Sequence, residues 1–168
     1  MILGHHQLKG RVDELFPLID PYKIGASSCD VTVGKDLILE GGEKINLAGL
    51  CEENPWIMEP GQFLLVSMAE WTKVPETLSC LFLLKSTQAR MGMQHIFAGW
   101  IDPGWDGILT MELKNVNQFT PLALWPGMPI GQLIYMETSG GGSCYGGRYQ
   151  HSNTVSGARK EIDYDAGA

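Results

Sequence analysis

The sequence has few of the features that mark proteins of membranes, of the secretory pathway or of nucleic-acid complexes. No stretch approaches the ~20 apolar residues of a membrane-spanning helix, and the opening MILGHH is followed by charged residues rather than by a signal peptide's apolar run. Only 12 Lys and Arg stand against 19 Asp and Glu, a net charge of −7. We therefore expect no membrane or nucleic-acid partner, although a few locally gathered cations could still bind a polyphosphate.

Familiar metal and phosphate motifs are also missing. The four cysteines form no C-x-x-C pair, and their spacing matches no zinc-ligand pattern; they are Cys29, Cys51, Cys80 and Cys144. The phosphate-binding loop G-x-x-x-x-G-K-S/T is absent. We predict no metal held by protein side chains, and reduced thiols in a cytoplasmic protein, because the cytosol keeps thiols reduced.

Long helical periodicity is lacking as well, apart from a short amphipathic pattern within residues 2–15. The chain is instead rich in glycine (21) and proline (9), which suits many short strands joined by turns. Strand-like runs fall at residues 30–33, 36–39, 62–68, 78–84, 107–113 and 130–136. We predict one mainly β domain, a barrel or sandwich, over residues 1–138, followed by a Gly/Ser-rich tail over residues 139–168.

The most informative stretch is AGWIDPGWDGILTMEL, residues 98–113. Asp102 opens a Pro-Gly turn, and the strand that follows alternates, so Ile108, Thr110 and Glu112 share one face. A carboxylate held on a rigid strand inside a cavity could take and give a proton. The plainer alternative is that Asp102 only caps the turn and that Glu112 faces solvent.

Two further stretches could bind phosphate. Residues 85–92, KSTQARMG, end a buried strand with hydroxyls, two cations and a glycine. Residues 145–150, YGGRYQ, place aromatic side chains and an arginine on a glycine-rich tail, which could close over a ligand. Solvated charges at a strand end and a disordered tail remain the simpler alternatives.

Taken together, these stretches resemble the dCTP deaminase family of the dUTPase-like superfamily, over nearly the whole chain. Residues 85–92 resemble its R-S-S-x-A-R-x-G motif, and residues 98–113 resemble A-x-x-I-D-P-G-W/F-x-G-x-x-x-x-E. Further matching segments are ASSCDV with Gly34, EPGQFLL, GMPIGQL and the tail motif at 145–150. The resemblance implies a dUTPase-like distorted jelly-roll or β-barrel fold, assembled as a homotrimer.

The resemblance also implies roles for individual residues. Glu112 would be the general base and acid for deamination of dCTP to dUTP and ammonia, Ser86 and the Ala98 carbonyl would hold the attacking water, and Arg90 would assist. Asp102 would read the deoxyribose 3′-hydroxyl. The remaining substrate contacts would come from Lys85, Thr87, Gln88, Ala89, Thr110, Met111, Tyr145, Arg148 and Ser152. The triphosphate would carry Mg²⁺, no zinc would be needed, and dTTP is a candidate inhibitor.

The chain departs from the family pattern at four positions around the expected substrate. They are Lys85 and Trp100, where Arg is usual, Arg148, where Lys is usual, and Ser152, where Gln is usual. These changes leave open a monophosphate or a modified cytosine as the substrate.

Two other functions fit the same resemblance. A dUTP diphosphatase, or an enzyme that both deaminates and hydrolyses, would use Asp102 to position water at the α-phosphate. Trp105, near the position of that branch's base-stacking Tyr, and Glu112 favour the deaminase. A non-catalytic nucleotide-binding regulator would not need the set Ser86, Arg90 and Glu112.

Overall fold

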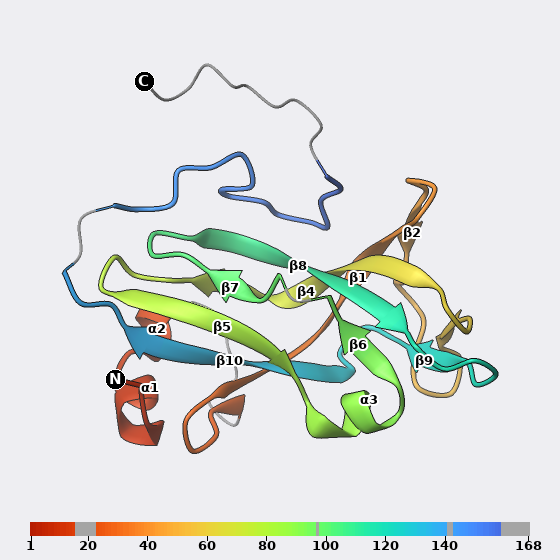
Figure 1. Ribbon diagram of the computed structural model, residues 1–168, viewed down its shortest axis with the longest axis horizontal. Coiled ribbons are helices and arrows are strands. Elements are labelled where there is room, and N and C mark those ends of the chain that lie inside the picture. Colours follow the sequence, from red (N-terminus) through yellow and green to blue (C-terminus); the bar gives the residue numbers. More distant parts are fainter. Residues whose placement is uncertain (16–22, 97, 141–142, 159–168) are drawn as a thin grey trace.

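The computed structural model describes residues 1–15, 23–96, 98–140 and 143–158. Its main body is an antiparallel sheet that curls into a half-barrel (Figure 1), with strand order β6-β8-β4-β1-β10-β5-β7 and β2 paired to β1. The bounds are β1 Cys29–Leu39, β2 Lys44–Asn46, β4 Phe63–Lys73, β5 Leu78–Leu84, β6 Met93–His95, β7 Trp100–Ile101, β8 Asp106–Asn115 and β10 Pro129–Glu137. The predicted mainly β class is confirmed.

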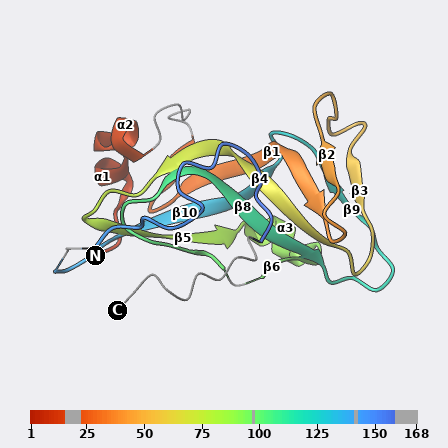
Figure 2. The same ribbon diagram turned by 90° about the horizontal axis from the view of Figure 1, so that it is seen from above.

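Smaller elements flank this sheet. Strands β3 (Trp56–Met58) and β9 (Leu122–Leu124) form a separate two-stranded sheet. Helices α1 (His5–Gly10) and α2 (Val12–Leu15) lie at one end of the molecule, and β2, β3 and β9 lie at the other (Figure 2). A third helix, α3 (Ser86–Arg90), follows β5. No helix in the described ranges is long and apolar enough to cross a membrane.

Strand β1 joins the two halves of the sheet. Its first residues pair with β10 and its last residues pair with β4, and the β1–β4 register shifts between Val33 and Leu37. The sequence predicted two strands separated by Gly34, whereas the structure has one strand that changes partner there. A side chain on Gly34 would come within 2.8 Å of the Met68 carbonyl oxygen, so only glycine allows β1 and β4 to approach this closely.

Three X-Pro-Gly-X turns end or begin strands, and the one that Asp102 opens is predicted by the sequence. In each, the amide after the glycine donates to the residue before the proline: Gln62 to Glu59 at 3.0 Å, Trp105 to Asp102 at 3.3 Å and Met128 to Trp125 at 3.1 Å. Their glycines, Gly61, Gly104 and Gly127, all have positive φ. Proline sets the first central φ and glycine accepts the second, which fixes these turns locally.

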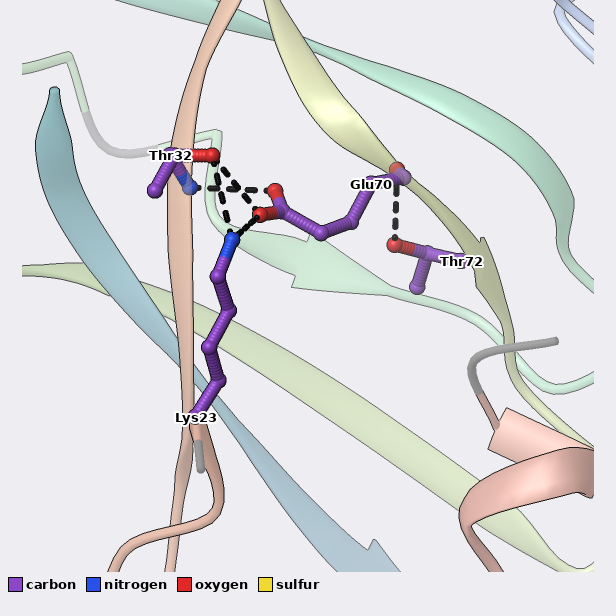
Figure 3. Close-up of polar contacts among 4 residues, drawn as sticks. All are labelled: Lys23, Thr32, Glu70 and Thr72. Carbon is purple, nitrogen blue, oxygen red and sulfur yellow. Dashed lines mark hydrogen bonds and ion pairs between the residues drawn. The ribbon is translucent and has the colours of Figure 1, made fainter. Parts of the chain in front are cut away.

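A buried polar cluster ties β1 to β4 beside the register shift (Figure 3). The Glu70 carboxylate accepts hydrogen bonds from the Thr32 amide at 3.0 Å and the Thr32 hydroxyl at 2.8 Å. It also pairs with the Lys23 ammonium at 2.5 Å. Because the Glu70 side chain is only 8% exposed, these donors replace the water that the carboxylate loses.

The described part of the tail runs along β8 (Figures 1 and 2). The His151 amide donates to the Asp106 carbonyl at 2.9 Å, and the Ile108 amide donates to the Ser152 carbonyl at 2.7 Å. Val155 is buried. Residues 141–142 and 159–168 of the predicted tail lie outside the described residues.

Candidate active site

A cavity of about 470 Å³ lies between β8, the segment leading into it and the tail. Most of its wall is apolar or aromatic, and its polar side chains are few, as in pockets that bind small molecules. The lining residues are Phe63, Leu65, Ala98, Trp100, Ile101, Asp102, Trp105, Ile108, Leu109, Thr110, Glu112, Tyr145, Tyr149, Ser152, Ser156, Gly157 and Ala158.

Glu112 reaches this cavity because of the alternation of β8. Thr110 and Glu112 line the cavity, whereas Met111 and Leu113 are buried in the core. Leu109 lines the cavity too, against the alternation. The β4–β8 register shifts between Ser67 and Trp71, opposite this part of β8, which disturbs the pleat.

The Glu112 carboxylate has one close polar neighbour among the described residues. The His95 Nε2 atom lies 3.2 Å from Glu112 Oε2, and the His95 side chain is 10% exposed. The edge of this imidazole meets the Phe82 ring, with 4.7 Å between the ring centroids. Glu112 Oε2 is itself buried, and no described group completes a well-aligned hydrogen bond to it. The carboxylate therefore lies beside a histidine and keeps acceptor capacity for a ligand.

Asp102 stands at the start of its turn, on the cavity wall. The Trp100 indole donates to Asp102 Oδ1 at 2.9 Å, although Trp100 is 57% exposed as a residue. Trp105, three residues after Asp102, is 8% exposed and packs against Tyr145 with ring centroids 5.5 Å apart. The turn thus brings a carboxylate and two indoles to one side of the cavity.

The tail forms the wall on the other side of the cavity. Tyr145, Tyr149 and Ser152 line the cavity, and the Ser156 amide donates to the Thr110 hydroxyl at 3.0 Å. Arg148 is exposed within the same segment and is not part of the lining.

The predicted phosphate-binding segment lies away from this cavity within one chain. None of residues 85–90 is among the lining residues, and neither is Met111. Lys85 forms an ion pair with Asp30, and the Gln88 side chain turns inward to donate to the Pro129 carbonyl at 2.8 Å. The side chains left exposed on this segment are Ser86, Thr87, Ala89 and Arg90.

Of the residues predicted for the site, the structure therefore brings six together: Ala98, Asp102, Thr110, Glu112, Tyr145 and Ser152. The described lining contains no Lys or Arg. Across the described ranges, no three His, Cys, Asp or Glu side chains converge as a metal site would require.

The sequence-based prediction omitted His95 and Tyr149. His95 stands three residues before the motif that begins at Ala98, and Tyr149 lies inside the tail motif. His95 carries no local signal beyond its residue type, whereas Tyr149 is one of the aromatic side chains of that motif. The pairing of β6 with β8 brings His95 beside Glu112, and the path of the tail places Tyr149 at the cavity.

The chain matches a family of known proteins over most of its length. Residues 2–138 match the family model described as dCTP deaminase-like. The chain is 38% identical over 151 residues to "dCTP deaminase, dUMP-forming" of Acidothermus cellulolyticus, covering 78% of each chain. It is 32% identical over 187 aligned residues to the protein of the same name from Streptomyces avermitilis, covering 98% of this chain and 97% of the relative.

The fold has a counterpart among solved structures. The 2′-deoxycytidine 5′-triphosphate deaminase of Agrobacterium tumefaciens superimposes with a TM-score of 0.67 at 15% identity. The match covers 82% of this chain and 48% of that protein, so it supports the shared fold of the β domain.

Proposed function

The chain belongs to the dCTP deaminase family, and we propose that it removes the 4-amino group of dCTP by hydrolysis, with Glu112 as the proton shuttle. The observation that carries this proposal is a strand-held carboxylate at the wall of a largely apolar cavity, with His95 beside it. Rigid placement of the acid–base group on a strand is what such catalysis requires.

In the proposed reaction the Glu112 carboxylate takes a proton from a water molecule as its oxygen bonds to C4 of the cytosine. This first proton passes to N3, where it stays in the product. The carboxylate then takes the second proton from the new C4 hydroxyl and gives it to the 4-amino group, so that the C4–N bond breaks and ammonia leaves. The C4 oxygen becomes the carbonyl of uracil. The buried Oε2 atom, which lacks an aligned hydrogen-bond partner among the described groups, supports this use of the carboxylate.

The rest of the cavity fits a deoxynucleoside. Trp105 and Tyr145 offer flat apolar surface for the base and sugar, and the Asp102 carboxylate is the acceptor that we assign to the 3′-hydroxyl. The Ala98 carbonyl is the acceptor that we assign to the attacking water.

We also propose that a second copy of the chain completes the site, within a homotrimer. A triphosphate needs cations, and the described lining offers none, whereas Ser86, Thr87 and Arg90 are exposed on α3. From a neighbouring copy, this segment would hold the triphosphate of the Mg²⁺–dCTP substrate, together with Tyr145 and Arg148. Ser86 would hold the water beside Glu112, and dTTP would compete for the same pocket.

The product is dUTP if the reaction stops at deamination. The relatives named above are called dUMP-forming, which favours a second candidate function in which the same site also releases pyrophosphate. Asp102, on the cavity wall, is the carboxylate that could position water for that step.

A substrate panel tests both proposals. Purified protein with Mg²⁺ is incubated with dCTP, dCMP, dUTP and 5-methyl-dCTP, and the products are resolved by chromatography. We expect loss of dCTP with release of ammonia, at a rate that zinc chelators leave intact. Stable dUTP indicates deamination alone, whereas dUMP with pyrophosphate indicates the two-step reaction. Absence of deaminated product from any cytosine nucleotide contradicts the proposal.

A further inference from the structure

We propose that Gln150 is a positioning residue that locks the tail to the turn carrying Asp102, so that recognition of the sugar 3′-hydroxyl depends on the tail. The inference rests on the proposed function, because it assigns to Gln150 the placement of the group that reads the deoxyribose.

Both polar atoms of the Gln150 carboxamide form hydrogen bonds with the backbone of this turn. Its Nε2 donates to the Gly104 carbonyl at 2.7 Å, and its Oε1 accepts from the Asp106 amide at 3.3 Å. Gly104 and Asp106 flank Trp105, so the side chain spans the C-terminal half of the turn that begins at Asp102. A single side chain thus satisfies two backbone groups that the turn itself leaves without a partner.

The turn is anchored independently on its far side. The Asp106 carboxylate accepts from the Trp71 indole and pairs with the Lys73 ammonium at 3.3 Å. Both partners lie on β4, next to β8 in the sheet. Because Asp106 is held by the sheet, a hydrogen bond from Gln150 to its amide fixes the tail to a rigid point.

Backbone hydrogen bonds on either side of Gln150 also join the tail to this turn. The Tyr145 amide donates to the Pro103 carbonyl at 2.7 Å, and the His151 amide donates to the Asp106 carbonyl at 2.9 Å. A Cβ atom on Gly104 would lie 2.7 Å from Cys144 Cβ, so the tail passes directly over the turn. Turn and tail therefore behave as one packed unit.

Asp102 lies at the start of this unit. Its Oδ1 is occupied by the Trp100 indole at 2.9 Å, which leaves the other carboxylate oxygen for a ligand. The direction of that oxygen follows from the geometry of residues 102–106, which Gln150 holds. Loss of the two Gln150 hydrogen bonds should therefore weaken recognition of the sugar more than it slows the chemistry at Glu112.

The test compares Gln150→Leu with Asn153→Leu, a change on an exposed tail residue. Turnover of dCTP is measured beside turnover of its 2′,3′-dideoxy analogue, which lacks the hydroxyl assigned to Asp102. We expect Gln150→Leu to lower kcat/KM for dCTP about tenfold, mainly through KM, and to leave the dideoxy analogue nearly unchanged. Asp102→Asn should show the same loss of discrimination, and Asn153→Leu should retain the wild-type ratio.

A second readout does not depend on activity. Without nucleotide, Gln150→Leu should increase amide hydrogen exchange in residues 103–106 and 145–152, while the β4–β8 ladder keeps its protection. Exchange equal to that of Asn153→Leu, or an unchanged ratio of the two substrates, overturns the proposal. Wild-type protein that turns over neither nucleotide would refute the proposed function instead, and the exchange measurement would still decide whether Gln150 holds the tail to the turn.

Discussion

At the scale of single residues, Glu112 and its surroundings carry the proposed chemistry. Glu112→Gln keeps the size of the side chain but removes its ability to accept a proton. We expect deamination of dCTP to fall by ~10²-fold or more, the scale of losing general acid–base catalysis. Binding should change little, because the carboxylate is not assigned to the phosphates. Turnover and calorimetric binding are measured side by side.

The matched control is Glu43→Gln, which makes the same chemical change on an exposed residue after β1. It should leave both turnover and binding unchanged. Near-normal turnover of Glu112→Gln with intact binding would remove Glu112 from the mechanism.

The cysteines separate into two classes by burial. Cys29 and Cys80 are buried, and burial raises the pKa of the Cys29 thiol to about 12 and that of Cys80 further above its usual value. Cys51 and Cys144 are exposed. Since the thiolate is the reactive form, a thiol reagent near pH 8 should label two cysteines in the native protein and all four after denaturation. Mass spectrometry of the labelled peptides would contradict this expectation if Cys29 or Cys80 reacted before unfolding.

At the scale of elements, the irregular junction of β1 and β4 depends on the Glu70 cluster. Glu70→Ala would leave the buried Thr32 amide and hydroxyl without their acceptor, and should lower the free energy of unfolding by about 3 kcal/mol. Lys23→Met removes only a partly exposed partner, 31% exposed, and should cost about 1 kcal/mol or less. Urea unfolding followed by circular dichroism measures both values. Equal effects of the two changes would show that the charge pair, rather than the buried hydrogen bonds, matters here.

Backbone hydrogen bonds also hold the tail against β8. Without the tail, the amide of Ile108 would lose its described acceptor, and the cavity would lose the wall formed by Tyr145, Tyr149 and Ser152. The tail is therefore part of the site as well as its cover. Its backbone amides and carbonyls pair with the first residues of β8, which β6 does not cover, and this explains how a Gly/Ser-rich segment can be ordered.

At the scale of the whole molecule, the site is proposed to be shared between copies, with Glu112 from one and Arg90 from another. Glu112→Gln and Arg90→Ala should each have strongly reduced activity alone. When the two variants are unfolded together and refolded as a mixture, about a quarter of the sites should combine an intact Glu112 with an intact Arg90, and activity should return. Refolding each variant alone is the control. A mixture as inactive as its components would place both residues in one chain's site.

The sequence by itself determined the features that depend on neighbouring residues. Pro-Gly pairs fixed the turns at Gly61, Gly104 and Gly127, because their backbone angles are set within four residues. Strand β5 was predicted with its observed bounds, and the alternation along β8 assigned Glu112 and Thr110 to one face. Burial on one face imposes a period of two, which is visible without any partner strand.

Tertiary structure alone decided which distant segments meet. His95 reaches Glu112 because β6 pairs with β8, and Gln150 reaches Gly104 because the tail turns back along the same strand. Lys85, predicted for a phosphate, pairs with Asp30 within the chain. Each of these contacts depends on which strands pair and on the path of a loop. Local periodicity does not encode either feature, because the free energy that selects the contacts comes from closing the whole sheet around one core.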